Sequence, residues 1–333
     1  MLKKLIERSD HEGRVWSTEI CNKGEGEPLS IFTCGADSTV RVYSLEGSSL
    51  KQEEALPKSH TRSVRALAVD KTGTLLAAAG FDKKVSVYSL SGDPIEEVAS
   101  FESHENEIKD LAFHHSADLL ATCGRDKSIW VWEYDEMFEF SLVCVVNAHG
   151  QDVKCVSWVP TQDWMLSGSY DNTIKLWKRD PEAEDETEYF CFQTLTAHRD
   201  TVWTLAVDLE GQTFFSAGND GLIIRWDFDI SSKEFRLTHK IETGFEEPIY
   251  SLAWDSSRNL LFAATGENSI ALFTSKADSP IEKKWVQEQA HQNDVNKIKW
   301  DPEHQILVSV GDDAKMILWT LNQDFGQKEE TQD

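Results

Sequence analysis

The stretch SGSYDNTIKLW, residues 167–177, decides the fold. A tight-turn sequence around Asp171 separates two runs in which β-branched, aromatic and polar residues alternate as far as Trp177. Such alternation on both sides of a short turn is typical of a half-buried β-hairpin. The stretch therefore predicts two antiparallel strands that are joined at Asp171.

The same turn recurs along the whole chain at intervals of 45, 44, 45, 49, 47 and 46 residues. The turn residues are Asp37, Asp82, Asp126, Asp171, Asp220, Glu267 and Asp313. Six positions after each turn comes an aromatic residue: Tyr43, Tyr88, Trp132, Trp177, Trp226, Phe273 and Trp319. A period near 45 residues is that of a propeller blade, so the sequence predicts an all-β, seven-bladed β-propeller with four strands in each blade.

A histidine precedes five of the turns by 22 residues, and four units have a hydroxyl residue four positions before the Asp. The histidines are His60, His104, His149, His198 and His291, and the hydroxyl residues are Thr122, Ser167, Ser216 and Ser309. One such set could be a hydrolase triad, but these sets recur blade after blade without a nucleophile-elbow sequence. We therefore expect a structural network of hydrogen bonds in which the Asp orients the His, the His is bonded to the hydroxyl, and the hydroxyl is bonded to the indole N–H of the Trp. No catalytic residue, metal ligand or cofactor site is predicted, and the protein is not expected to be an enzyme.

Units one and six depart from the pattern. Unit one has its histidine at His11, whereas unit six has Phe245 and Glu267 where the others have His and Asp, so we expect packing to hold that blade. No outer strand is evident after Trp319, and residues 2–7 precede unit one with nothing else to pair with. We expect this segment to complete blade seven and to protect its edge. One domain is predicted over residues 1–322, with a disordered acidic tail over residues 323–333.

The composition indicates which classes of partner and which cellular compartment to expect. The 33 Lys and Arg against 58 Asp and Glu give a net charge of −25, which repels nucleic acid and anionic membranes. Six cysteines without a C-x-x-C motif indicate a reducing compartment rather than a disulfide scaffold or a metal site. The apolar runs are too short to span a membrane, and the charged N-terminus does not look like a secretory signal. We expect a cytosolic protein, with the nucleus as an open second location.

Function in such a fold is expected at the rim of the central channel, where the loops between strands meet. Two kinds of position should project there: the residue before each turn Asp, and residues beside the hydrophobic position four after each His. They include five cations and five aromatic residues: Arg14, Arg65, Lys109, Arg125, Lys154, Trp16, Phe81, Tyr170, Trp203 and Tyr250. Such a patch on an acidic body predicts binding of an anionic peptide that also presents an apolar or aromatic side chain. The alternative is that the cations pair with neighbouring acids and the aromatic residues only fill the rim.

The repeat resembles the WD-repeat family, with Ser103-His104 and Ala148-His149 where that family commonly has Gly-His. LLATCGRDKSIWVWE (119–133) and HGQDVKCVSW (149–158) are more specific, and they resemble the WD-repeat proteins of cytosolic iron–sulfur protein assembly, the CIAO-type targeting factor family. The resemblance implies a non-catalytic scaffold that helps to deliver 4Fe–4S clusters to cytosolic and nuclear apoproteins. It also implies that the exposed arginine of the family's third blade is Arg125.

The partners that the resemblance implies are proteins: a MIP18-type small acidic protein, a HEAT-repeat targeting protein, a hydrogenase-like cluster carrier and apo iron–sulfur clients. The chain would be a monomer within this hetero-complex. Another WD-repeat adaptor, such as a ubiquitin-ligase substrate receptor or a chromatin or peptide reader, stays open as the alternative.

Overall fold

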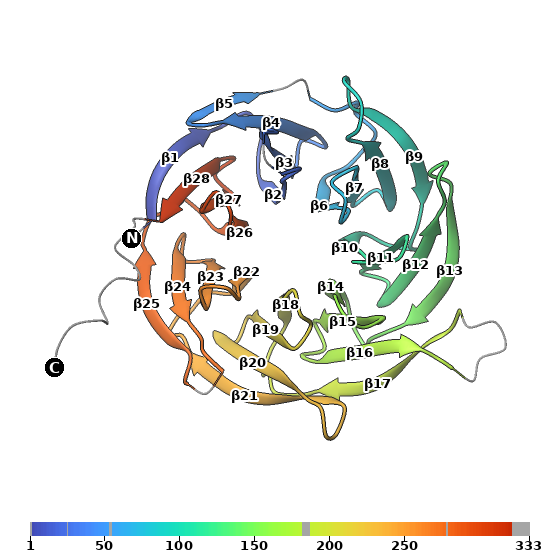
Figure 1. The fold of residues 1–333 in the computed structure, drawn as a ribbon, viewed down its shortest axis with the longest axis vertical. Coiled ribbons are helices and arrows are strands. Elements are labelled where there is room, and N and C mark those ends of the chain that lie inside the picture. Colours follow the sequence, from blue (N-terminus) through green and yellow to red (C-terminus); the bar gives the residue numbers. More distant parts are fainter. Residues whose placement is uncertain (1, 25, 53–54, 182–186, 278, 322–333) are drawn as a thin grey trace.

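The computed structural model describes residues 2–24, 26–52, 55–181, 187–277 and 279–321. Seven four-stranded antiparallel sheets stand as blades in a ring, and each blade presents its first strand to the centre (Figure 1). This confirms the predicted seven-bladed propeller. The interpretation of residues 323–333 as an acidic tail lies outside the described residues. Within the described ranges, no helix is long and apolar enough to cross a membrane.

The strands follow the repeat closely. Blades one and two comprise β2 (Val15–Cys21), β3 (Leu29–Gly35), β4 (Val40–Glu46), β5 (Ser49–Gln52), β6 (Val64–Val69), β7 (Leu75–Gly80), β8 (Lys84–Ser89) and β9 (Glu96–Glu102). Blades three and four comprise β10 (Ile108–Phe113), β11 (Leu119–Gly124), β12 (Ser128–Tyr134), β13 (Phe140–Asn147), β14 (Val153–Val159), β15 (Trp164–Ser169), β16 (Ile174–Arg179) and β17 (Tyr189–Leu195). Blades five and six comprise β18 (Val202–Val207), β19 (Thr213–Gly218), β20 (Leu222–Asp229), β21 (Glu234–Glu242), β22 (Ile249–Asp255), β23 (Leu260–Thr265), β24 (Ile270–Thr274) and β25 (Glu282–Gln287). Blade seven comprises β26 (Val295–Asp301), β27 (Ile306–Gly311), β28 (Met316–Leu321) and β1 (Leu2–Arg8).

Blade seven is built from both ends of the described chain. Strand β1 pairs antiparallel with β28, from Leu2 opposite Leu321 to Arg8 opposite Met316. The Lys315 ammonium also lies 2.5 Å from the Glu7 carboxylate. The prediction that the N-terminal segment closes the ring is therefore confirmed, and β28 has no open edge.

The apolar core lies between neighbouring blades. Val15 and Ile31 of blade one, for example, pack with Val308 and Leu318 of blade seven, and all four side chains are fully buried. Because side chains alternate between the two faces of a strand, each blade contributes to one cluster on either side of it. The ring is thus held by a continuous series of blade-to-blade contacts, which fixes the positions of the loops at its rim.

Candidate protein-binding rim

Each inner strand has a β-bulge directly after its first residue. In blade four, pairing runs from Val153 to Cys155 and omits Lys154. The equivalent omitted residues in the seven blades are Trp16, Arg65, Lys109, Lys154, Trp203, Tyr250 and Asn296. A bulge leaves its extra residue unpaired and re-aims the side chain. All seven are at positions that the sequence assigned to the rim, and six of them are among its predicted cations and aromatic residues.

A recurring backbone hydrogen bond brings the second set of predicted residues to the same place. In blade three, the amide of Arg125 donates to the carbonyl of Glu107 over 2.9 Å, two residues before the bulge residue Lys109. The same bond, 2.8–3.0 Å long, forms in the other blades from the residue before each turn: Ala36, Phe81, Tyr170, Asn219, Gly266 and Asp312. The structure therefore gathers the bulge residues and the pre-turn residues at one end of the ring.

Cations and aromatic rings contact one another at this rim, in several cases across the blade boundaries. The Arg65 guanidinium lies 5.2 Å from the ring centre of Trp16, and the Lys109 ammonium lies 4.5 Å from that of Phe81. These cation–π contacts join blade two to blade one and blade three to blade two, and they fix the stems of the cations.

The contacts continue through blades four, five and six. The Lys154 ammonium lies between Tyr170, at 5.0 Å, and Trp203, at 4.9 Å. Trp203 in turn packs edge-on against Tyr250, whose hydroxyl donates to Asp294. Tyr170 is 47% exposed, so its ring is available to a partner.

Acidic neighbours pair with most of the rim cations. Lys109 lies 2.8 Å from Glu107, Lys154 lies 3.3 Å from Asp152, and Arg14 lies 3.1 Å from Asp312. Both lysine side chains are largely buried, and burial lowers the pKa of Lys154. The rim is therefore less basic than its five cations alone suggest, as the alternative interpretation of the sequence anticipated.

The two exposed predicted cations are arginines. The side chains of Arg14 and Arg125 are 58% and 57% exposed. Arg125 lies 3.7 Å from Glu107, which is long for an ion pair, so most of its N–H donors face solvent. Arg65 differs from both, because it is half-buried and makes no ion pair with an acid in the described part of the chain.

Sequence reasoning missed Arg62, which lies two residues after His60. Its side chain is 55% exposed, donates to the Phe81 carbonyl over 2.7 Å, and lies 3.1 Å from Glu107. The available signal was the position of Arg62 in the loop between blades one and two, beside the turn of its own unit. That signal is weak, because loop residues outside the repeat have no fixed direction.

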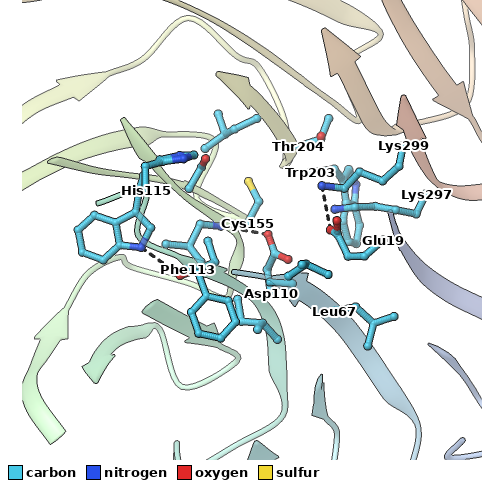
Figure 2. Close-up of a pocket in the computed structure, with 18 residues that line it drawn as sticks. Glu19, Leu67, Asp110, Phe113, His115, Cys155, Trp203, Thr204, Lys297 and Lys299 are labelled. Carbon is cyan, nitrogen blue, oxygen red and sulfur yellow. Dashed lines mark hydrogen bonds and ion pairs between the residues drawn. The ribbon is translucent and has the colours of Figure 1, made fainter. Parts of the chain in front are cut away.

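Below the rim, the inner strands line a cavity of about 190 Å³ (Figure 2). Glu19 and Lys299 form an ion pair of 2.8 Å, and Asp110 accepts the amide of Val156. With Lys297 the cavity has two acidic and two basic side chains, so it offers no excess charge to a ligand. No group of three or more His, Cys, Asp or Glu side chains among the residues with described coordinates is arranged to hold a metal ion.

The network of His, hydroxyl, Asp and Trp is complete in four blades. In blade five, His198 Nδ1 lies 2.9 Å from Asp220 and His198 Nε2 lies 2.7 Å from Ser216 Oγ, to which Trp226 Nε1 donates over 2.9 Å. Ser216 is fully buried and its hydroxyl is hydrogen-bonded to both His198 and Trp226, so a substrate cannot reach it. The other complete sets are His104 with Thr122, Asp126 and Trp132; His149 with Ser167, Asp171 and Trp177; and His291 with Ser309, Asp313 and Trp319.

Blade two has only part of the network. His60 Nδ1 lies 3.0 Å from Asp82, but Ala78 occupies the hydroxyl position, and the buried His60 Nε2 has no hydrogen bond among the described residues. Ser86, opposite Ala78 on the neighbouring strand, also has a buried hydroxyl without a partner there. Unpaired buried polar atoms are costly, so this blade is a weak point of the network.

Restoring the hydroxyl should therefore stabilise the protein. We expect Ala78→Ser to raise the free energy of unfolding by about 0.5–1.5 kcal/mol, the usual contribution of one hydrogen bond. Urea denaturation would measure the change. Ala77→Ser is the matched control, because Ala77 faces an apolar cluster and its hydroxyl would lack a partner. A loss of stability with Ala78→Ser as large as that with Ala77→Ser would contradict the prediction.

Comparison with known proteins adds independent findings. The family "WD domain, G-beta repeat" matches residues 52–89, 95–133, 140–178, 189–227 and 283–320. Blades one and six, which depart from the repeat pattern, lie outside these matches for most of their length.

Several relatives are similar over almost their whole length. The probable cytosolic iron-sulfur protein assembly protein Ciao1 of Culex quinquefasciatus is 32% identical over 95% of this chain and 97% of its own. The CIAO1 homolog of Caenorhabditis elegans, with the same description, is 35% identical over 94% of this chain and 95% of its own. The Ixodes scapularis homolog is 33% identical over 82% and 84%.

Proposed function

The chain belongs to the WD-repeat family of cytosolic iron–sulfur protein assembly proteins, and from this membership we propose that it is a non-catalytic scaffold of the cytosolic iron–sulfur targeting complex. In this role it helps to deliver 4Fe–4S clusters to cytosolic and nuclear apoproteins by binding assembly partners and clients. The names of its relatives support a cytosolic location for this work.

The observation that carries the proposal is the rim. It combines exposed guanidinium groups with a partly exposed aromatic ring on a body of charge −25, and arginine is well suited to bind the carboxylates of a protein partner. The buried, fully engaged hydroxyl groups of the network support a structural rather than a catalytic use of its serines.

The proposed partners are proteins. They are a MIP18-type small acidic protein, a HEAT-repeat targeting protein, a hydrogenase-like cluster carrier and apo iron–sulfur clients, with the chain present as a monomer in the hetero-complex. The acidic exterior supports this choice over nucleic acid, because a long polyanion would be repelled on approach.

Arg125→Glu should weaken the capture of an acidic partner by about 10–100-fold, since one charge-assisted hydrogen bond contributes about 1.5–3 kcal/mol. The measurement is affinity capture of the assembly proteins by purified chain, with circular dichroism to show that the variant folds. Arg236→Glu is the control, because Arg236 is equally exposed but lies on the outer strand β21. Equal capture by the Arg125 and Arg236 variants would remove the support for the rim.

A further inference from the structure

At the rim, between blades two and three, three cations surround one carboxylate. Arg62, Lys109 and Arg125 lie 3.1, 2.8 and 3.7 Å from Glu107. Their three positive charges exceed the single negative charge of Glu107 by two. This is the one place at the described rim where several cations share one acid, whereas Arg14 and Lys154 each have an acid of their own.

The four side chains differ in how far they reach solvent. Glu107 and Lys109 are 16% and 14% exposed, while the two guanidinium groups are more than half exposed. Lys109 already neutralises Glu107 at short range. Burial raises the pKa of Glu107, but Lys109, Arg62 and Arg125 outweigh this effect and bring the pKa below its ordinary value, so the carboxylate stays ionised between them. The excess positive charge is therefore located on the arginines, at the surface.

The Arg62 guanidinium is held in place before any ligand arrives, whereas for Arg125 only the backbone is fixed. Arg62 donates to the Phe81 carbonyl over 2.7 Å, and its guanidinium lies 5.8 Å from the centre of the Phe81 ring. The backbone amide of Arg125 donates to the carbonyl of Glu107 over 2.9 Å. Fixing a binding group in advance reduces the entropy that it loses on binding.

We propose that Arg62 and Arg125 form a two-arginine clamp for a single carboxylate of a protein partner, with Glu107 holding the Arg62 guanidinium at 3.1 Å and lying 3.7 Å from that of Arg125. Arg125 makes no side-chain hydrogen bond within the described residues, so its N–H fork is available to bind a carboxylate in the bidentate manner typical of arginine. Arg62 adds the N–H groups that Phe81 and Glu107 leave unused. The ligand is thus an Asp or Glu side chain, or a chain-terminal carboxylate, that enters above Glu107.

This clamp rests on the proposed function, since it specifies where an acidic partner is bound. It adds Arg62, from the neighbouring blade, to the predicted contact at Arg125. The clamp spans two neighbouring blades, because Arg62 lies in the loop that enters blade two and its partner Glu107 lies in the loop that enters blade three, between β9 and β10 (Figure 1).

The test uses fluorescence anisotropy of the full chain with a labelled, end-blocked peptide of alternating glycine and glutamate at low salt. We expect Arg62→Gln and Arg125→Gln each to weaken binding by about 10-fold or more, as the loss of a charge-assisted hydrogen bond requires. Arg199→Gln is the control, because Arg199 is equally exposed but pairs with Glu242 in blade five. A peptide with glutamine in place of glutamate should bind to none of these proteins.

The outcomes separate the clamp from the proposed function. Undetectable binding of the glutamate peptide, or equal binding by the Arg62 and Arg199 variants, would overturn the clamp. Assembly partners that depend on Arg125 but not on Arg62 would also overturn it, while leaving the scaffold role intact. Peptide binding that depends on both arginines, with partner capture unaffected by either, would support the clamp and overturn its proposed use in assembly.

Discussion

Removing residues 1–8 is expected to lower the free energy of unfolding by about 3–6 kcal/mol, because each lost strand hydrogen bond contributes roughly 0.5–1.5 kcal/mol. Six residue pairs join β1 to β28, and Leu2 and Ile6 pack against the cores on the two sides of blade seven. Total stabilities of single domains are typically about 5–15 kcal/mol, so this loss would leave a marginally folded ring. Thermal denaturation followed by circular dichroism would measure it.

Two further measurements make this result specific to ring closure. Lys3→Thr is a matched control, because the Lys3 side chain is exposed and the substitution keeps the backbone pairing with Thr320. A synthetic peptide of residues 1–8, added to the shortened chain, should restore part of the lost stability by occupying the edge of β28. An unchanged melting temperature after the deletion would show that β1 is dispensable.

The sequence predicts this fold well because the blade is a repeated unit. Three features recur in the units with little variation: an acidic residue in the turn, an aromatic residue six positions later and a histidine before the turn. Each indicates the same local geometry in its blade. The role of residues 2–7 also follows from counting strands, since blade seven lacked one and the N-terminal segment had no other partner. The first prediction depends on a local pattern and the second on a count of strands along the chain, and neither requires knowledge of the contacts between blades.

The details of the rim could be predicted only in part. The positions of Lys109 and Arg125 follow from the repeat, but their sharing of Glu107 with Arg62 depends on contacts between two blades. Such contacts have no period along the chain, because loop lengths and rotamers differ between units. The bulge that directs Lys109 to the rim also lacks a sequence signal of its own, since its inserted residue can be of any type.

Asp220→Ala should cost about 3–5 kcal/mol of unfolding free energy, because three donors, among them the buried His198 Nδ1, lose their acceptor at about 1–3 kcal/mol each. The Asp220 side chain is 3% exposed and accepts hydrogen bonds from His198 Nδ1 over 2.9 Å, from the Arg199 amide over 2.9 Å and from the Leu222 amide over 3.1 Å. Glu267→Ala in the next blade is the natural control. Glu267 is exposed and accepts one amide, that of Glu246, so we expect a loss below about 1 kcal/mol.

The pH dependence of the Asp220→Ala effect identifies its cause. Burial raises the pKa of Asp220, but the hydrogen bonds from His198, Arg199 and Leu222 outweigh this and lower it below its ordinary value. A lowered folded-state pKa gives stability that is complete above the unfolded pKa, near 4, and is lost as the pH falls below it. The difference in unfolding free energy between the native chain and Asp220→Ala should therefore be largest near neutral pH and should shrink below about pH 4. A difference that is independent of pH would mean that the carboxylate fills space rather than accepting hydrogen bonds as an ion.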